Sequence, residues 1–169
     1  MDPLILTVAL DPVAFERLDG LRRAHFPPER NLIPAHVTLL HRLPGEEIAT
    51  VLATLREAAA RTAPFRITAD GLRPLGRGVA ITLESPALTA LRADLALRFG
   101  PRLSAQDRQG FRPHVTIQNK VAPEQARALL ARLQADFRPF AIRGEGLLLW
   151  HYRGGPWQRA AALPFPPAP

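Results

Sequence analysis

The sequence contains no cysteine, a single lysine and no long hydrophobic segment. The lack of cysteine excludes disulfides, thiolate metal sites and redox chemistry through thiols, and it fits a reducing compartment. The apolar run near the N-terminus is short, lacks preceding basic residues and is interrupted by Asp11-Pro12, so it predicts neither a signal peptide nor a membrane span. We therefore expect a cytoplasmic protein with no membrane partner.

Positive charge is carried almost entirely by arginine. Lys and Arg together number 22 against 15 Asp and Glu, and Lys120 is the only lysine. Guanidinium groups suit bidentate contacts with phosphate, which favours an anionic partner, although arginines on solvated helix faces produce the same composition. The charge balance therefore indicates a class of partner and identifies no site.

The length of 169 residues and the hydrophobic content of 47%, without a long polar tract, predict a globular protein rather than a disordered one. We expect a single domain over residues 1–163, which is monomeric, and a flexible tail over residues 164–169.

Comparison of the chain with itself reveals a duplication. Residues 34–42, PAHVTLLHR, align with residues 112–120, RPHVTIQNK, so that both histidines, both valines, both threonines and a terminal basic residue coincide. The register continues into an amphipathic helical pattern after each segment. The two repeats extend over about 4–72 and 79–150.

Each repeat predicts the same order of elements. A strand leads into Asp11-Pro12 in the first repeat and into Ser85-Pro86 in the second, and each dipeptide is typical of a helix start. The histidine strand and a second helix follow, and then a further strand. Strands are expected at 4–10, 65–72, 79–84, 140–150 and 158–163, with hairpin turns at 76–78 and 154–155. This order predicts an α+β fold of two sheet-and-helix lobes related by approximate twofold symmetry, with a central cleft.

Side chains alternate between the two faces of a strand. His36 and Thr38 therefore point to one face, while Val37 and Leu39 point to the other. The same alternation places Arg42, and Lys120 in the second repeat, on the polar face. It places His41 on the opposite face, where a structural or surface role is expected.

Two such strands brought together would surround one phosphate with two imidazoles and two hydroxyls. One neutral histidine accepts a proton from the attacking group, and the other, protonated, donates one to the leaving oxygen. The threonine hydroxyls hydrogen-bond the non-bridging oxygens. This scheme requires no metal or other cofactor. We predict four catalytic residues and a supporting pair of cations: His36, Thr38, His114, Thr116, Arg42 and Lys120.

The tetrads His36-Val37-Thr38-Leu39 and His114-Val115-Thr116-Ile117 resemble the signature of the two-histidine (2H) phosphoesterase superfamily. Within it, the chain is similar to the RNA 2′,3′-cyclic phosphodiesterases, also called 2′-5′ RNA ligases. The resemblance covers nearly the whole chain. It implies a bilobal α+β fold, metal-independent opening of a 2′,3′-cyclic phosphate at an RNA or oligonucleotide end to a 2′-phosphate, and weak reverse ligation.

The resemblance leaves the substrate open. An arginine is frequent in the RNA-processing family at the position of Asn119, and other members of the superfamily act on small cyclic nucleotides or on ADP-ribose cyclic phosphate. Phe111, Arg112 and Tyr152 are further candidates for substrate contact, through base stacking or a phosphate. An RNA-binding module without turnover is an alternative function. A histidine metal site lacks a third ligand at suitable spacing.

Overall fold

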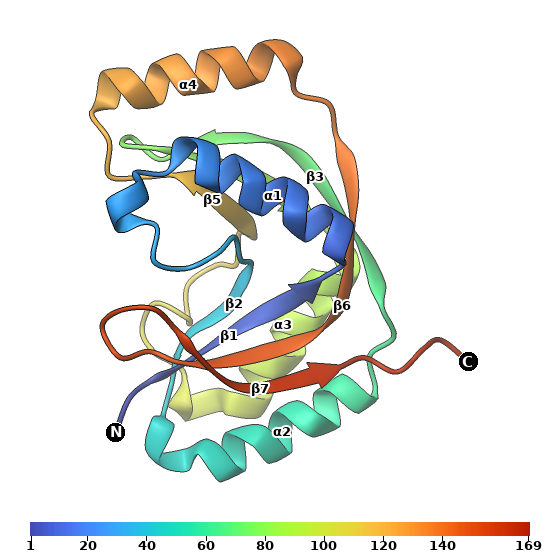
Figure 1. The fold of residues 1–169 in the computed structure, drawn as a ribbon. Coiled ribbons are helices and arrows are strands. Elements are labelled where there is room, and N and C mark those ends of the chain that lie inside the picture. The colour runs from blue at the N-terminus through green and yellow to red at the C-terminus, as the bar shows by residue number, and fades with distance from the viewer.

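The computed structural model describes residues 1–169 and contains four α-helices and seven strands in one antiparallel sheet. Figure 1 shows their arrangement. In chain order the elements are β1 (Leu4–Leu10), α1 (Pro12–His25), β2 (Thr38–Leu43), α2 (Ile48–Ala60), β3 (Phe65–Pro74), β4 (Val79–Glu84), α3 (Pro86–Phe99), β5 (His114–Gln118), α4 (Pro123–Asp136), β6 (Phe140–His151) and β7 (Gln158–Pro164).

The helix starts predicted from the sequence are confirmed. The side chain of Asp11 accepts a hydrogen bond from the backbone N–H of Ala14 at 2.9 Å, and Ser85 Oγ accepts one from Leu88 at 3.2 Å. In both helices a proline occupies the first turn, where its missing N–H has no intrahelical partner to lose. α1 and α3 therefore begin where the two dipeptides predict.

The sheet has the strand order β2-β1-β6-β3-β4-β5, and β7 pairs with β6. Along one edge of β6, residues 140–144 pair with β3 and residues 146–151 pair with β7. Along the opposite edge of β6, residues 144–151 pair with β1. The long strand β6 therefore belongs to both halves of the sheet. β2 and β5 form the two ends of this order; His114 and Thr116 lie in β5, whereas Thr38 begins β2 and His36 lies two residues before it.

Two glycines allow β3, β6 and β7 to crowd together where the sheet divides. A Cβ atom on Gly144 would lie 2.9 Å from the Phe65 ring, and one on Gly146 would lie 2.7 Å from the Leu163 carbonyl oxygen. Contacts this short exclude any side chain without movement of the neighbours. The sequence Gly144-Glu145-Gly146 thus fixes the point at which the two lobes join.

The two lobes do not coincide with the two repeats. The β5 lobe contains β3, β4, β5 and the first half of β6, and it is covered by α1 and α4; the β2 lobe contains β1, β2, β7 and the second half of β6, with α2 and α3 (Figure 1). α1 of the first repeat contacts β5 of the second, while α2 contacts β6 and β7. The predicted bilobal α+β fold is confirmed, but each lobe is built from both repeats.

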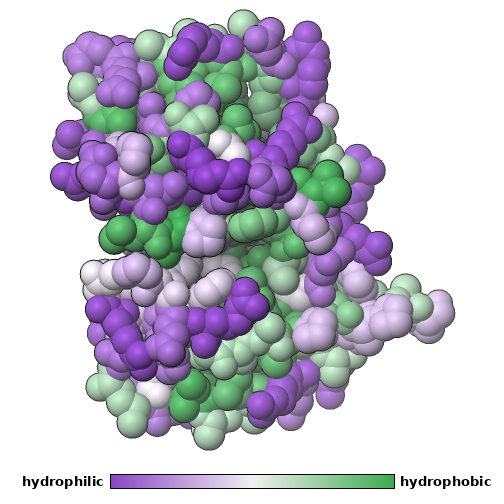
Figure 2. Space-filling view, viewed as in Figure 1, coloured by the Kyte–Doolittle hydropathy of each residue, from purple (hydrophilic) through white to green (hydrophobic).

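One hydrophobic core of 30 buried residues extends through both lobes. It includes Phe165, which is 6% exposed, contacts the Phe65 ring at a centroid distance of 5.7 Å and donates its N–H to the Glu145 carbonyl at 2.9 Å. The tail expected from residue 164 is therefore corrected, because the chain stays packed through residue 165. In the space-filling view hydrophilic and hydrophobic residues are mixed on both halves of this face, and green and pale residues lie at the waist between them (Figure 2). No helix is both long and apolar enough to span a bilayer.

Candidate active site

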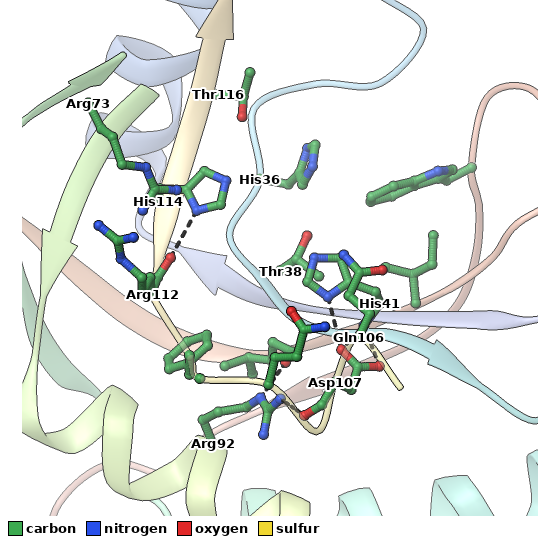
Figure 3. Close-up of a pocket in the computed structure, with 16 residues that line it drawn as sticks. His36, Thr38, His41, Arg73, Arg92, Gln106, Asp107, Arg112, His114 and Thr116 are labelled. Atoms are coloured by element: carbon green, nitrogen blue, oxygen red, sulfur yellow. Dashed lines mark hydrogen bonds and ion pairs between the residues drawn. The ribbon is translucent and has the colours of Figure 1, made fainter. Parts of the chain in front are cut away.

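The two histidine motifs line one cavity between the lobes. The cavity has a volume of about 420 Å³, and both histidines and both threonines of the motifs contribute to its wall. Figure 3 shows His36 and His114 on opposite sides of this space, with Thr38 and Thr116 across from each other between them. The four residues predicted to be catalytic therefore surround a common space.

Each histidine ring is oriented by the backbone two residues before it. His36 Nδ1 lies 2.8 Å from the Pro34 carbonyl oxygen, and His114 Nδ1 lies 2.9 Å from that of Arg112. A carbonyl oxygen only accepts hydrogen bonds, so Nδ1 carries the proton in both rings. In each neutral ring this leaves Nε2 as the free acceptor, and the same device is repeated in both halves of the molecule.

The surroundings of both histidines favour the neutral form. Burial lowers the pKa of His36 to about 4, and the positive charge of Arg22 adds to this effect against the hydrogen bond to Pro34. Burial lowers the pKa of His114 as well, and Arg73, His41 and Arg112 contribute further positive charge beside it. A bound phosphate would stabilise the protonated forms through its negative charge.

The threonine hydroxyls are free. Neither Thr38 nor Thr116 uses its hydroxyl in a hydrogen bond within the protein, and both line the cavity. Arg22 and Arg92 instead hold the backbone at these strands: Arg22 donates to the Thr116 carbonyl at 2.8 Å and Arg92 to the Leu39 carbonyl at 2.6 Å. Each motif strand is therefore held by a buried arginine from a different helix: β5 by Arg22 of α1, and β2 by Arg92 of α3.

His41 also lines the cavity, which corrects the prediction that it lies on the opposite strand face. The cause is a bulge in β2: Thr38 pairs with Thr7 and Leu40 pairs with Leu6, so Leu39 is an extra residue. An extra residue inverts the alternation beyond it. Leu39 and Leu40 are both buried as a result, and His41 turns to the cavity side.

A second register shift in β2, between the pairs Leu6–Leu40 and Leu4–Leu43, leaves Arg42 exposed and outside the cavity wall. β5 contains a bulge equivalent to the one at Leu39: Ala80 pairs with Thr116 and Val79 with Gln118, so Ile117 is the extra residue. Lys120 then follows in a left-handed conformation with φ 64° and also lies outside the cavity wall. The expected pair of cations beside the histidines is therefore not formed by Arg42 and Lys120.

Of the three other residues predicted to contact the substrate, two line the cavity and one does not. Phe111 and Arg112 line the cavity, whereas Tyr152 is exposed and does not. Next to Tyr152 along the chain, Trp150 is half-buried and its indole N–H donates a hydrogen bond to Thr7 Oγ1 at 2.9 Å.

A buried carboxylate holds one side of the cavity. Asp107 is 2% exposed and accepts hydrogen bonds from the backbone N–H groups of His41 and Arg42, from His41 Nδ1 at 2.9 Å and from Ser104 Oγ at 3.0 Å. Burial alone would raise the pKa of Asp107, but these hydrogen bonds together outweigh it and lower the pKa. The segment after α3 is thereby anchored to β2.

Other cavity residues were not predicted from the sequence. Trp157, from the β6–β7 connection, contacts the His36 ring at a centroid distance of 4.8 Å, and Arg73 projects from β3. Neither belongs to a recognisable motif, and only the strand register places them. No group of three or more His, Asp or Glu side chains is arranged to hold a metal ion.

Comparison with known proteins gives the same assignment. The family model of the 2′-5′ RNA ligase superfamily matches residues 10–156. The fold is similar to the crystal structure of TT0787 of Thermus thermophilus, with 21% identity, 96% and 97% of the two chains covered and a TM-score of 0.69. It is also similar to a crystal structure described as a phosphoesterase, with 21% identity, 98% and 99% of the two chains covered and a TM-score of 0.61. A third similar structure is apo LigT of E. coli, with 19% identity, 96% and 98% of the two chains covered and a TM-score of 0.57. No curated protein matches the chain. With most of its length matched, the chain belongs to the 2′-5′ RNA ligase superfamily of two-histidine phosphoesterases.

Proposed function

We propose that this protein hydrolyses a 2′,3′-cyclic phosphate at the end of an RNA or oligonucleotide and leaves a 2′-phosphate. The observation that carries this proposal is the pair of histidines with backbone-fixed Nδ1–H groups on opposite sides of one cavity, beside two free threonine hydroxyls. In-line displacement at phosphorus requires a base on one side and an acid on the other. The crystal structure of LigT complexed with 3′-AMP supports the proposal, because a protein of similar fold there binds a nucleotide.

The two histidines take different roles in the proposed reaction. We assign His36 as the base, because burial lowers its pKa to about 4 and leaves it neutral at pH 7, and we assign His114, whose protonated form the bound phosphate would stabilise, as the acid. It removes a proton from water as the oxygen bonds to phosphorus. The bond from phosphorus to the 3′ oxygen breaks, and protonated His114 donates its proton to that oxygen. Exchange with solvent then restores both protonation states.

The threonines stabilise the phosphoryl group during this step. The Thr38 and Thr116 hydroxyls donate to the non-bridging oxygens, on which negative charge increases in the transition state. Opening of the cyclic phosphate by a 5′-hydroxyl in place of water uses the same groups: the bond from phosphorus to the 3′ oxygen breaks, and the RNA ends are joined through a 2′-5′ bond, with low yield in dilute aqueous solution.

The test is hydrolysis of an oligonucleotide ending in 2′,3′-cyclic phosphate, in the presence of a chelator, by the wild type, His36→Ala and His114→Ala. We expect each substitution to lower the rate at least ~100-fold. His25→Ala, at the end of α1 and outside the cavity, is the matched control and should retain the wild-type rate.

Product analysis separates the alternatives. A 2′-phosphate product supports the proposed direction of opening. Turnover of adenosine 2′,3′-cyclic phosphate or ADP-ribose cyclic phosphate in preference to the oligonucleotide would change the substrate assignment. Tight RNA binding without any turnover would identify a binding module instead.

A further inference from the structure

A row of three side chains crosses the β5 lobe beside the candidate site. Arg73 of β3 lies opposite Ala80 of β4, and Ala80 lies opposite Thr116 of β5. Residues directly opposite on neighbouring strands point to the same face. Because Ala80 is small, the long Arg73 side chain passes over it and reaches the cavity, which it lines.

The corresponding row in the β2 lobe is uncharged. Thr38 of β2 lies opposite Thr7 of β1, which lies opposite Leu148 of β6. Leu148 thus holds the position that Arg73 holds in the β5 lobe. It borders a separate, mainly apolar cavity of about 370 Å³ together with Trp150 and Trp157. The approximate twofold symmetry of the two rows is therefore broken: Arg73 extends from one row toward His114, whereas the row beside Thr38 has only uncharged side chains, and the Arg159 guanidinium at the wall of the apolar cavity lies over the Trp150 ring.

A second unpaired arginine accompanies Arg73. Arg112 also lines the cavity, and neither guanidinium has an ion pair or a hydrogen bond within the protein. Burial and the positive charge of Arg112 lower the pKa of Arg73, as expected of two cations held together without a counterion. By contrast, the buried Arg22 and Arg92 are satisfied by backbone carbonyls.

The two arginines lie beside the place of the cleaved phosphate rather than around it. Figure 3 shows Arg73 and Arg112 on the side of His114 that faces away from His36. The space between the histidines already has two imidazoles and two hydroxyls to contact the scissile group. The paired guanidiniums therefore have room and charge for a different anion.

We propose that Arg73 and Arg112 form a subsite for a second phosphate group of the substrate, next to the cyclic phosphate that is opened. The inference rests on the proposed function and extends it, because it selects substrates with at least two phosphates and fixes the direction in which they lie. The second phosphate is either the internal diester of an oligonucleotide or a terminal monoester, and guanidinium pairs recognise both.

Three substrates with the same cyclic phosphate test this subsite. They are adenosine 2′,3′-cyclic phosphate, the same nucleotide with a 5′-phosphate, and the dinucleotide ApA 2′,3′-cyclic phosphate. We expect the wild type to show kcat/KM about 10-fold higher with a second phosphate, in line with charge-assisted hydrogen bonds. Arg73→Gln and Arg112→Gln should each remove most of this preference. Comparison of the second and third substrates shows whether the monoester or the diester is preferred.

The control is Arg66→Gln, which removes the same charge from an exposed position of β3 outside the cavity and should preserve the preference. Equal losses on all three substrates in Arg73→Gln would overturn the proposal, since the arginine would then act on the cleaved phosphate. Unchanged preference would also overturn it.

A binding experiment keeps this inference separate from the proposed function. If the wild type hydrolyses none of the substrates, the proposed activity fails, but the dissociation constants of adenosine 2′-phosphate and adenosine 2′,5′-bisphosphate still decide the subsite. We expect about 10-fold tighter binding of the bisphosphate, lost in Arg73→Gln. Equal affinity of the wild type for both ligands would overturn the subsite.

Discussion

Thr38 and Thr116 carry hydroxyls that no protein group uses, although both residues lie next to buried strand positions. Replacement by valine keeps the shape of the side chain and removes only the hydroxyl. We expect Thr38→Val and Thr116→Val each to lower kcat about 100-fold, the loss typical of one donor to a developing negative charge. Thermal unfolding should stay within about 0.5 kcal/mol of the wild type. A normal kcat in both variants would show that the hydroxyls do not contact the reacting phosphate.

His36 makes the folded protein sensitive to acid. Its pKa falls from an unfolded value of 6.5 to about 4 in the folded state. Between these values the unfolded chain binds more protons, so stability is complete above pH 6.5 and is lost as the pH falls toward 4. Between pH 7.5 and 4.5, we expect the free energy of unfolding of His36→Asn to fall by about 2 kcal/mol less than that of the wild type. Urea unfolding at both pH values measures this difference, with His151→Asn as the control; parallel losses of stability in the wild type and His36→Asn would contradict the lowered pKa of His36.

At the scale of single elements, the strands and helix starts were predictable, and the bulges were not. Hydrophobic alternation and the dipeptides Asp11-Pro12 and Ser85-Pro86 are local signals. The extra residue Leu39 depends on how β2 pairs with β1, which no local pattern records. This extra residue turns His41 to the cavity, and a second register shift before the Leu4–Leu43 pair leaves Arg42 outside it.

Asp107 stabilises the bulged segment by accepting the N–H groups of His41 and Arg42. Asp107→Ala leaves these buried donors without a partner, and we expect a loss of about 3 kcal/mol in the free energy of unfolding. Asp94→Ala removes an exposed carboxylate that pairs with Arg98 and should cost far less stability than Asp107→Ala, because solvent screens this pair. Chemical denaturation compares the two. Equal, small losses would mean that the carboxylate does not anchor the loop to β2.

At the scale of the whole molecule, the duplication predicted two lobes and a shared site, because each repeat contributes one His-x-Thr segment and the proposed chemistry needs both around one phosphate. The exchange of helices between the repeats was not predictable, since it depends on contacts between distant parts of the chain such as α1 with β5. Arg73 was missed for the same reason, because only the register across three strands places it beside Thr116.

The junction of the lobes depends on a glycine in β6. A Cβ on Gly146 would lie 2.7 Å from a backbone oxygen of Leu163, whereas a Cβ on Gly155, in the β6–β7 connection, meets no atom within 4 Å. We expect Gly146→Ala to lower the free energy of unfolding by about 2 kcal/mol or more and Gly155→Ala to change it by less than about 0.5 kcal/mol. Thermal unfolding measures both. Similar stability of the two variants would contradict the close packing of β6 on β7.

The most direct test of the central claim replaces the leaving oxygen of the substrate. A cyclic phosphate with sulfur at the bridging 3′ position has a leaving group that needs no proton. If His114 is the acid, the hydrolysis rate of His114→Ala should fall at least ~100-fold with the oxygen substrate and less than ~10-fold with the sulfur substrate. If His36 is the base, the rate of His36→Ala should fall at least ~100-fold with both substrates. Equal losses of His114→Ala on the two substrates, or rescue of His36→Ala by sulfur, would contradict these roles.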